Sequence, residues 1–195
     1  MLFAYNISMD LKGTKKRNIA LWTLRIILTA ACIAMLAFIF SNSLQTGEQS
    51  SAQSSTVVDT VQDVAGAINP ESPIATATGA AKDRLHSAIR TLAHFSEFGA
   101  LGALMGWCCL SYTRKWQFLF IPFGGVALVP LLDEYLQTFS AGRGAEWKDI
   151  AVDGLGGVLG LILAVELVWL GIYIYQATRV RKMQKIAAQT EPLES

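Results

Sequence analysis

Charged residues are scarce in this sequence: Lys, Arg, Asp and Glu make up 16% of the 195 residues, whereas hydrophobic residues make up 52%. A soluble domain typically has about 25% charged residues. The apolar residues are also gathered into long blocks instead of being spread along one soluble core. The composition therefore predicts a membrane protein. The formal net charge of +1 indicates little about partners, because the distribution of charge matters more than its sum.

Cysteine is also scarce, and its spacing excludes two common uses. Cys32, Cys108 and Cys109 all lie inside apolar blocks. They have neither the pattern of a disulfide framework nor the spacing of a metal motif, so we assign them a packing role. The sequence also lacks a Walker, dinucleotide or Cys-x-x-Cys motif, and no basic patch is interleaved with aromatic residues. We therefore expect no cofactor and no nucleic-acid partner.

Four apolar blocks are long enough, or nearly so, for helices that cross a bilayer, which takes roughly 20 residues each. We expect an all-α protein, a four-transmembrane-helix bundle with an outer-side amphipathic helical segment between spans one and two. The expected spans are about 19–40, 92–110, 116–137 and 149–175, within a membrane domain of residues 19–176. A cleaved signal peptide is the competing interpretation of the first block, but no clear cleavage site follows it.

The segment between the first two spans, residues 41–91, is mostly small and polar. Ser41–Ser55 lacks apolar periodicity, which predicts a loop or a frayed helix. Apolar residues then recur at helical spacing from Val57 to Ile68, which indicates a short amphipathic helix on the membrane surface or over the bundle. A stretch with two prolines breaks this helix, and the next helix should begin near Ala80.

Basic residues predict the orientation. Four Lys or Arg residues lie in the tail 1–18, two in the turn 111–115 and four in the tail 177–195. With four spans these three segments share one side, which is cytoplasmic by the positive-inside rule. We therefore expect a multi-pass protein with both termini in the cytoplasm and membrane lipids around it. The last residues of the chain are expected to be disordered.

Ionisable residues gather where the expected spans meet the outer side, although such groups are costly at the edge of an apolar span. Arg90, His94 and Glu97 have the i, i+4, i+7 spacing of one helix face. Other acids end the third span and begin the fourth, and Arg143 lies in the turn between them. The candidate ligand-binding residues are Arg90, His94, Glu97, Asp133, Glu134, Gln137, Arg143, Asp149 and Asp153.

Glycines continue two of these faces and predict close helix packing. Gly102 and Gly106 form a small-x-x-x-small pair in the second span. Gly156 and Gly160 extend the stripe of Asp149 and Asp153 in the fourth span. Another acid of the fourth span, Glu166, lies well round the helix from this stripe and has no assigned role.

Four short blocks give the sequence a resemblance to a known family, the VanZ-like membrane proteins. In order they read FSNSLQTGEQSSAQS (40–54), R-x-x-x-H-F-x-E-F (90–98), D-E-x-x-Q (133–137) and G-R-x-x-x-x-K-D-x-x-x-D-x-x-G (142–156). The chain departs from the family at Thr91, where Lys is frequent, and at Phe98, where Tyr is frequent. The resemblance implies a bacterial cell-membrane protein with a role in reduced susceptibility to glycopeptide antibiotics, teicoplanin above all.

Three functions remain open for the polar residues. The first is recognition of a lipid-linked cell-wall precursor or a lipoglycopeptide, with Arg90 and Arg143 holding a phosphate or carboxylate. The second is a membrane-embedded hydrolase or transferase in which His94 is the general base and Glu97 or Asp133 orients it, although no nucleophile motif is visible. The third is a scaffold in which buried ion pairs fix the register of the helices.

A metal site is a variant of the enzyme hypothesis. His94, Glu97, Asp133 and Glu134 form a hard set of nitrogen and oxygen ligands. A single histidine is few for a transition metal, and di-metal helical bundles use two Glu-x-x-His pairs, whereas this sequence has one reversed pair. We therefore expect no metal at this site.

Overall fold

The regular elements that the structure describes are all helices, which confirms the predicted all-α class. The computed structural model describes the backbone of residues 2–190 and the side chains of residues 16–184. The elements are α1 (Leu2–Ser43), α2 (Gly47–Ile68), α3 (Ala80–Tyr112), the 3-10 helix η1 (Trp116–Leu119), α4 (Phe120–Gln137) and α5 (Trp147–Thr190).

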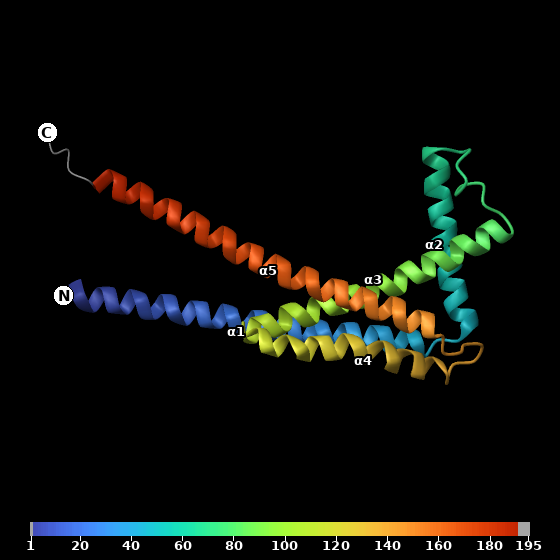
Figure 1. The fold of residues 1–195 in the computed structure, drawn as a ribbon, viewed down its shortest axis with the longest axis horizontal. Helices are drawn as coiled ribbons and strands as arrows, with labels where there is room; N and C mark the ends of the chain where they lie inside the picture. The colour runs from blue at the N-terminus through green and yellow to red at the C-terminus, as the bar shows by residue number, and fades with distance from the viewer. Residues whose placement is uncertain (1, 191–195) are drawn as a thin grey trace.

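Four of the helices form a bundle and one stands across its end. Helices α1, α3, α4 and α5 pack together and alternate in direction, while α2 lies across the end where α4 is joined to α5 (Figure 1). We call this end, which holds residues 133–153 and α2, the polar end. At the opposite end, the first half of α1 and the last half of α5 extend beyond the bundle (Figure 1).

Within the described residues, three helical segments are long and apolar enough to cross a membrane: Lys16–Ser43, Trp116–Gln137 and Trp147–Gln184. Many of their large apolar side chains are exposed, among them Ile26 at 65% and Ile33 at 62%. An exposed apolar surface of this extent is expected where helices face lipid instead of water. The expected span at 92–110 lies in α3 and is not among the three, so a count of four spans is not confirmed.

Helices α3 and α5 approach so closely that side chains are excluded along part of their contact. A Cβ atom on Gly102 would collide with the backbone of Gly157, and one on Gly160 would collide with the backbone of Gly99. Gly156 likewise lies against the backbone of Phe95. The small residues that predicted close helix packing therefore do form the contact between these two helices.

Several helix boundaries differ from the sequence prediction. The prediction of a loop or frayed helix at Ser41–Ser55 is wrong for most of that segment, because α1 continues to Ser43 and α2 begins at Gly47. The reason is a capping box, in which the Thr46 side chain accepts from the Gln49 N–H and the Gln49 side chain accepts from the Thr46 N–H. The predicted start of α3 at Ala80 is confirmed.

The two segments that were expected to be tails are largely helical. Helix α1 begins at Leu2 and α5 continues to Thr190, well past the expected ends of the spans. The C-terminal segment, residues 177–190, is rich in Lys, Arg, Gln and Ala, which favour helix. The disorder predicted for the last residues concerns 191–195, which lie outside the described residues.

Candidate functional site

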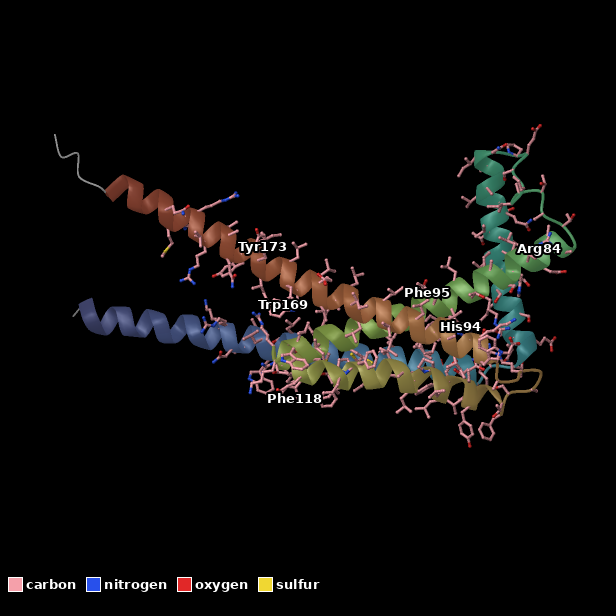
Figure 2. The ribbon with its side chains drawn as sticks, viewed as in Figure 1. Arg84, His94, Phe95, Phe118, Trp169 and Tyr173 are labelled. Atoms are coloured by element: carbon pink, nitrogen blue, oxygen red, sulfur yellow. The ribbon has the colours of Figure 1, made fainter. Side chains whose placement is uncertain are left out.

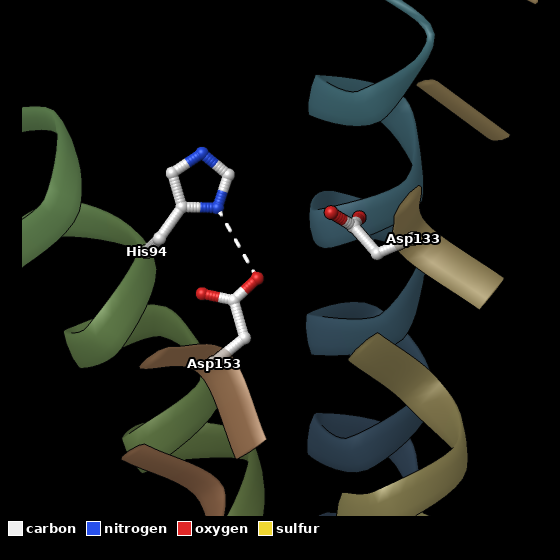
Figure 3. A group of neighbouring side chains, drawn as sticks. All are labelled: His94, Asp133 and Asp153. Carbon is white, nitrogen blue, oxygen red and sulfur yellow. Dashed lines mark ion pairs between the residues drawn. The ribbon is translucent and has the colours of Figure 1, made fainter. Parts of the chain in front are cut away.

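His94 lies on α3 at the polar end (Figure 2), and the close contact of α3 with α5 brings it beside Asp153. Gly156, nearly one turn after Asp153, packs on the backbone of Phe95, the residue that follows His94. As a result His94 Nδ1 lies 3.6 Å from Asp153 Oδ2 (Figure 3). Asp153 is fully buried, with 0% of its surface exposed. A backbone contact that only glycine permits therefore places this ion pair.

The polar atoms of this pair are short of hydrogen bonds. Both carboxylate oxygens of Asp153 and Nδ1 of His94 are buried without a hydrogen-bond partner among the described residues. Most buried polar atoms in folded proteins have such a partner, so an unpaired carboxylate needs an explanation. The other ring nitrogen of His94, Nε2, points away from Asp153 (Figure 3).

Helix α4 adds a second buried acid, Asp133, which is 1% exposed. Its two oxygens have partners: Ser43 Oγ donates to Oδ1, and Gln137 Nε2 donates to Oδ2 at 2.8 Å. One ligand atom from each of His94, Asp133 and Asp153 lies within 4.8 Å of the other two (Figure 3). We call these three residues the acid–histidine cluster.

Arg143 ties the turn between α4 and α5 to the end of α1. Its Nη1 donates to the carbonyl oxygens of Asn42 at 3.0 Å and Ser43 at 3.4 Å, and its Nη2 donates to Ser50 Oγ at 3.2 Å. A cation commonly caps the free carbonyls at a helix C-terminus in this way. Burial, and then the nearby positive charge of Arg90, lower the pKa of Arg143 from its ordinary value.

Two other acids of the predicted set, Glu134 and Asp149, lie outside the cluster, and Glu134 supports the turn. Glu134 is buried and accepts a hydrogen bond from the backbone N–H of Glu146 at 2.6 Å, just before α5 begins. Asp149 lies in the first turn of α5 and lines a small cavity of about 130 Å³ together with Arg90 and Asp153. Glu166 is exposed on α5 and lies near Trp116, toward the opposite end.

A larger cavity of about 310 Å³ opens beside the cluster. It lies between the bundle and α2, which contributes Ser50, Gln53, Ser54 and Val57. Its apolar lining includes Phe38, Ile39, Ile89 and Ala93. Its charged or titratable lining residues are Arg90, His94, Glu97, Asp133 and Arg143.

The structure thus brings together five of the nine predicted residues on one cavity and places Asp153 beside His94. Sequence reasoning missed Asn42, Ser43 and Ser50, which hold Arg143 and Asp133. The signal for them was the polar block 40–54, which we used for the family resemblance without assigning roles to its residues.

The fold and the site define a helical membrane protein with a polar cavity at one end of its bundle. The sequence profile of the VanZ/LLP1 family matches residues 28–175, which include the whole acid–histidine cluster and its cavity. The chain belongs to this family, and the resemblance noted in the sequence is confirmed. No curated protein and no solved structure matches the chain.

Proposed function

We propose that the polar end binds the phosphate-bearing head of a lipid-linked cell-wall precursor, or a lipoglycopeptide, and that this binding lowers susceptibility to teicoplanin. In this proposal the chain is a multi-pass protein of the bacterial cell membrane. Helix α3 crosses the membrane as the second of four spans, both termini are cytoplasmic and the polar end lies at the outer leaflet, where such ligands are exposed.

The observation that carries the proposal is the mixed lining of the 310 Å³ cavity. Arg90 and Arg143 provide two guanidinium groups, which suit a phosphate or carboxylate. Apolar residues such as Phe38 and Ile89 line the same cavity and suit the first carbons of a lipid chain. Two acids, Glu97 and Asp133, line the cavity as well, so its lining carries both signs of charge beside the apolar residues. A cavity that is both charged and apolar fits an amphiphile better than a small water-soluble ion.

Two arginines without an acidic partner favour ligand recognition over a purely structural network. Among the described side chains, ion pairs occur only at Lys82–Asp59 on the surface and at His94–Asp153. Arg90 makes no ion pair in that set, and Arg143 donates to backbone carbonyls and a serine hydroxyl instead of an acid. A scaffold whose only role was to hold helices would be expected to pair its buried charges.

Binding to lipid II in nanodiscs tests the proposal. Arg90→Gln removes a charge from the cavity, and Arg84→Gln is the matched control, because Arg84 is an exposed arginine on the same helix (Figure 2). A charge-assisted hydrogen bond contributes about 1.5–3 kcal/mol. We therefore expect Arg90→Gln to weaken lipid II binding by about tenfold or more, and Arg84→Gln to leave it unchanged. Equal affinities of the two variants would rule the proposed pocket out.

Teicoplanin susceptibility provides the cellular measurement. Expression of the wild-type chain in a sensitive Gram-positive strain should raise the inhibitory concentration of teicoplanin, and Arg90→Gln should remove that increase. Equal amounts of both proteins in the membrane fraction are the control. No change of susceptibility on expression of the wild-type chain would contradict this part of the proposal while leaving lipid binding to be judged by the nanodisc titration.

A second candidate function, a hydrolase or transferase, is supported by the position of His94. Asp153 faces Nδ1 and leaves Nε2 directed elsewhere, which is the arrangement of a general base oriented by an acid. In such a reaction Nε2 would accept the proton of a water or hydroxyl that attacks a lipid-linked phosphate or ester. Mass spectrometry of lipid-linked precursors incubated with wild type and His94→Gln tests it, and an absence of any wild-type turnover would count against it.

A further inference from the structure

We propose, against the expectation from the sequence, that the acid–histidine cluster of His94, Asp133 and Asp153 is a binding site for one divalent cation. This goes beyond the proposed function, because the site is defined without any lipid and each of the two can be tested in the absence of the other. The inference depends on the geometry of three side chains from three helices and on the two buried oxygens of Asp153, which have no hydrogen-bond partner among the described residues.

The spacing of the ligand atoms suits a single ion. His94 Nδ1 and Asp153 Oδ2 are 3.6 Å apart, and one ligand atom from each residue lies within 4.8 Å of the others. At metal–ligand distances of about 2.1–2.5 Å, neighbouring ligands are about 3–3.5 Å apart and opposite ligands about 4.2–5 Å apart. The three donors can therefore reach the same cation with small adjustments of their side chains.

The charge of the site also calls for a cation. Asp153 is fully buried, and neither of its carboxylate oxygens has a hydrogen-bond partner among the described residues. Asp133 is buried nearby, and Arg143 is directed to the end of α1 instead of toward either acid. His94 Nδ1, 3.6 Å from Asp153 Oδ2, offsets the charge of Asp153 only when the imidazole is protonated. Beside a neutral imidazole a buried carboxylate is costly, and a bound cation is one of the few arrangements that stabilise it.

The residues around Asp133 have the arrangement of a second coordination shell. Ser43 Oγ and Gln137 Nε2 each donate to one of its oxygens, which fixes the carboxylate while leaving lone pairs free on both atoms. Hydrogen bonds of this kind orient ligands in known metal sites. His94 lines both the 310 Å³ cavity and the 130 Å³ cavity, so a hydrated ion has a polar route to the cluster.

The donor set indicates the class of cation. One imidazole and two carboxylates are borderline-to-hard donors without sulfur, and the free positions of the ion would be filled by water or by a ligand in the larger cavity. This favours Mg²⁺ or Mn²⁺ over soft or sulfur-seeking metals. Mn²⁺ is the useful probe, since it reports both its binding and its ligands by paramagnetic resonance.

The test is a Mn²⁺ titration of the full chain in detergent, after removal of metals with EDTA. We expect one tightly bound Mn²⁺ per chain, and spin-echo modulation from a directly bonded ¹⁴N of His94. Asp153→Asn should weaken binding at least about tenfold, because loss of even an outer-shell partner typically costs about 10–100-fold in metal affinity. The matched control is Glu166→Gln, an exposed acid on the same helix, which should bind Mn²⁺ as the wild type does.

The wild-type measurement decides the proposal even if Asp153→Asn does not fold. Stoichiometric binding with ¹⁴N modulation, lost in His94→Gln but retained in Glu166→Gln, supports it. Binding of less than half an equivalent at millimolar Mn²⁺, or stoichiometric binding without ¹⁴N modulation, overturns it. A folded Asp153→Asn variant with unchanged affinity overturns it as well.

Discussion

Both ends of the bundle have charged side chains among apolar helices, but these side chains differ in their partners. At the opposite end, Arg25 Nε donates to the Ser111 carbonyl at 3.0 Å, and its guanidinium lies 5.1 Å from the ring centre of Trp22 and 4.9 Å from that of Tyr112. At the polar end, Asp153 is buried without a hydrogen bond among the described residues. A satisfied charge indicates anchoring, whereas an unsatisfied one indicates a missing partner.

The cavities of the two ends differ in the polarity of their lining residues. The opposite end has the larger one, about 660 Å³, with a lining that is mostly apolar and includes Cys32, Met105 and Phe118. An apolar hollow between membrane helices is readily filled by lipid chains. The 310 Å³ cavity of the polar end is smaller but carries the titratable residues. We therefore place the candidate site by the titratable residues of the lining and not by cavity volume.

Among substitutions that test this difference between the two ends, the largest loss of stability is expected from a glycine of α5. Gly160→Ala places a Cβ against the backbone of Gly99, which cannot move aside as a side chain would, so we expect a loss of about 3 kcal/mol or more. Gly171→Ala, toward the opposite end of the same helix, meets nothing within 4 Å and should be neutral or slightly stabilising. Thermal unfolding in detergent measures both, and equal stabilities would contradict the close α3–α5 contact.

An intermediate effect is expected at Asp133. Asp133→Ala leaves Gln137 Nε2 without its acceptor in a buried place, while Ser43 Oγ keeps the Ile39 carbonyl, so the change should cost about 2 kcal/mol. Asp59→Ala, which removes the half-exposed surface pair with Lys82, should cost less than about 1 kcal/mol. Chemical unfolding of the two variants checks the difference. If Asp133→Ala is as stable as wild type, the network described at the polar end does not contribute to folding.

The smallest effect is expected at the opposite end. Arg25→Lys keeps the charge but loses the flat guanidinium that lies over Trp22 and Tyr112, so the expected loss is about 0.5–1 kcal/mol. Thermal unfolding measures it, and binding of lipid II should be unchanged. Weaker lipid binding by this variant would mean that the two ends are not separate in function.

The sequence predicted the helical class, and residues that it placed on one helix face do lie together in the structure. Periodicity and hydropathy located α3 at Ala80 and the segment 116–137, since both have clear start or stop signals. The spacing of Arg90, His94 and Glu97 predicted that the three share one helix face, and all three line the 310 Å³ cavity. These are local properties, which a helix conveys directly from residue spacing.

The sequence could not predict contacts that depend on how the helices cross. That Asp153 faces His94 follows from the contact of Gly156 with Phe95, which is set by the packing of two helices. That Glu134 supports the turn through Glu146, while its neighbour Asp133 joins the cluster, depends on a rotation of α4 that spacing alone does not fix. The span count stayed open because α3, with its many small residues, is not among the clearly apolar helices.

Helix α2 is docked by its first residue, because the N–H of Gly47 donates to the carbonyl of Ala141 at 2.9 Å and a side chain on Gly47 would meet Gly142 O at 2.6 Å. One wall of the polar cavity therefore belongs to a segment outside the bundle. A molecule bound in this cavity would contact α2 and the bundle at once and would hold the two together. A shortened chain that kept the four long helices but lacked residues 47–79 would keep its apolar helices and lose the wall of the cavity that α2 provides.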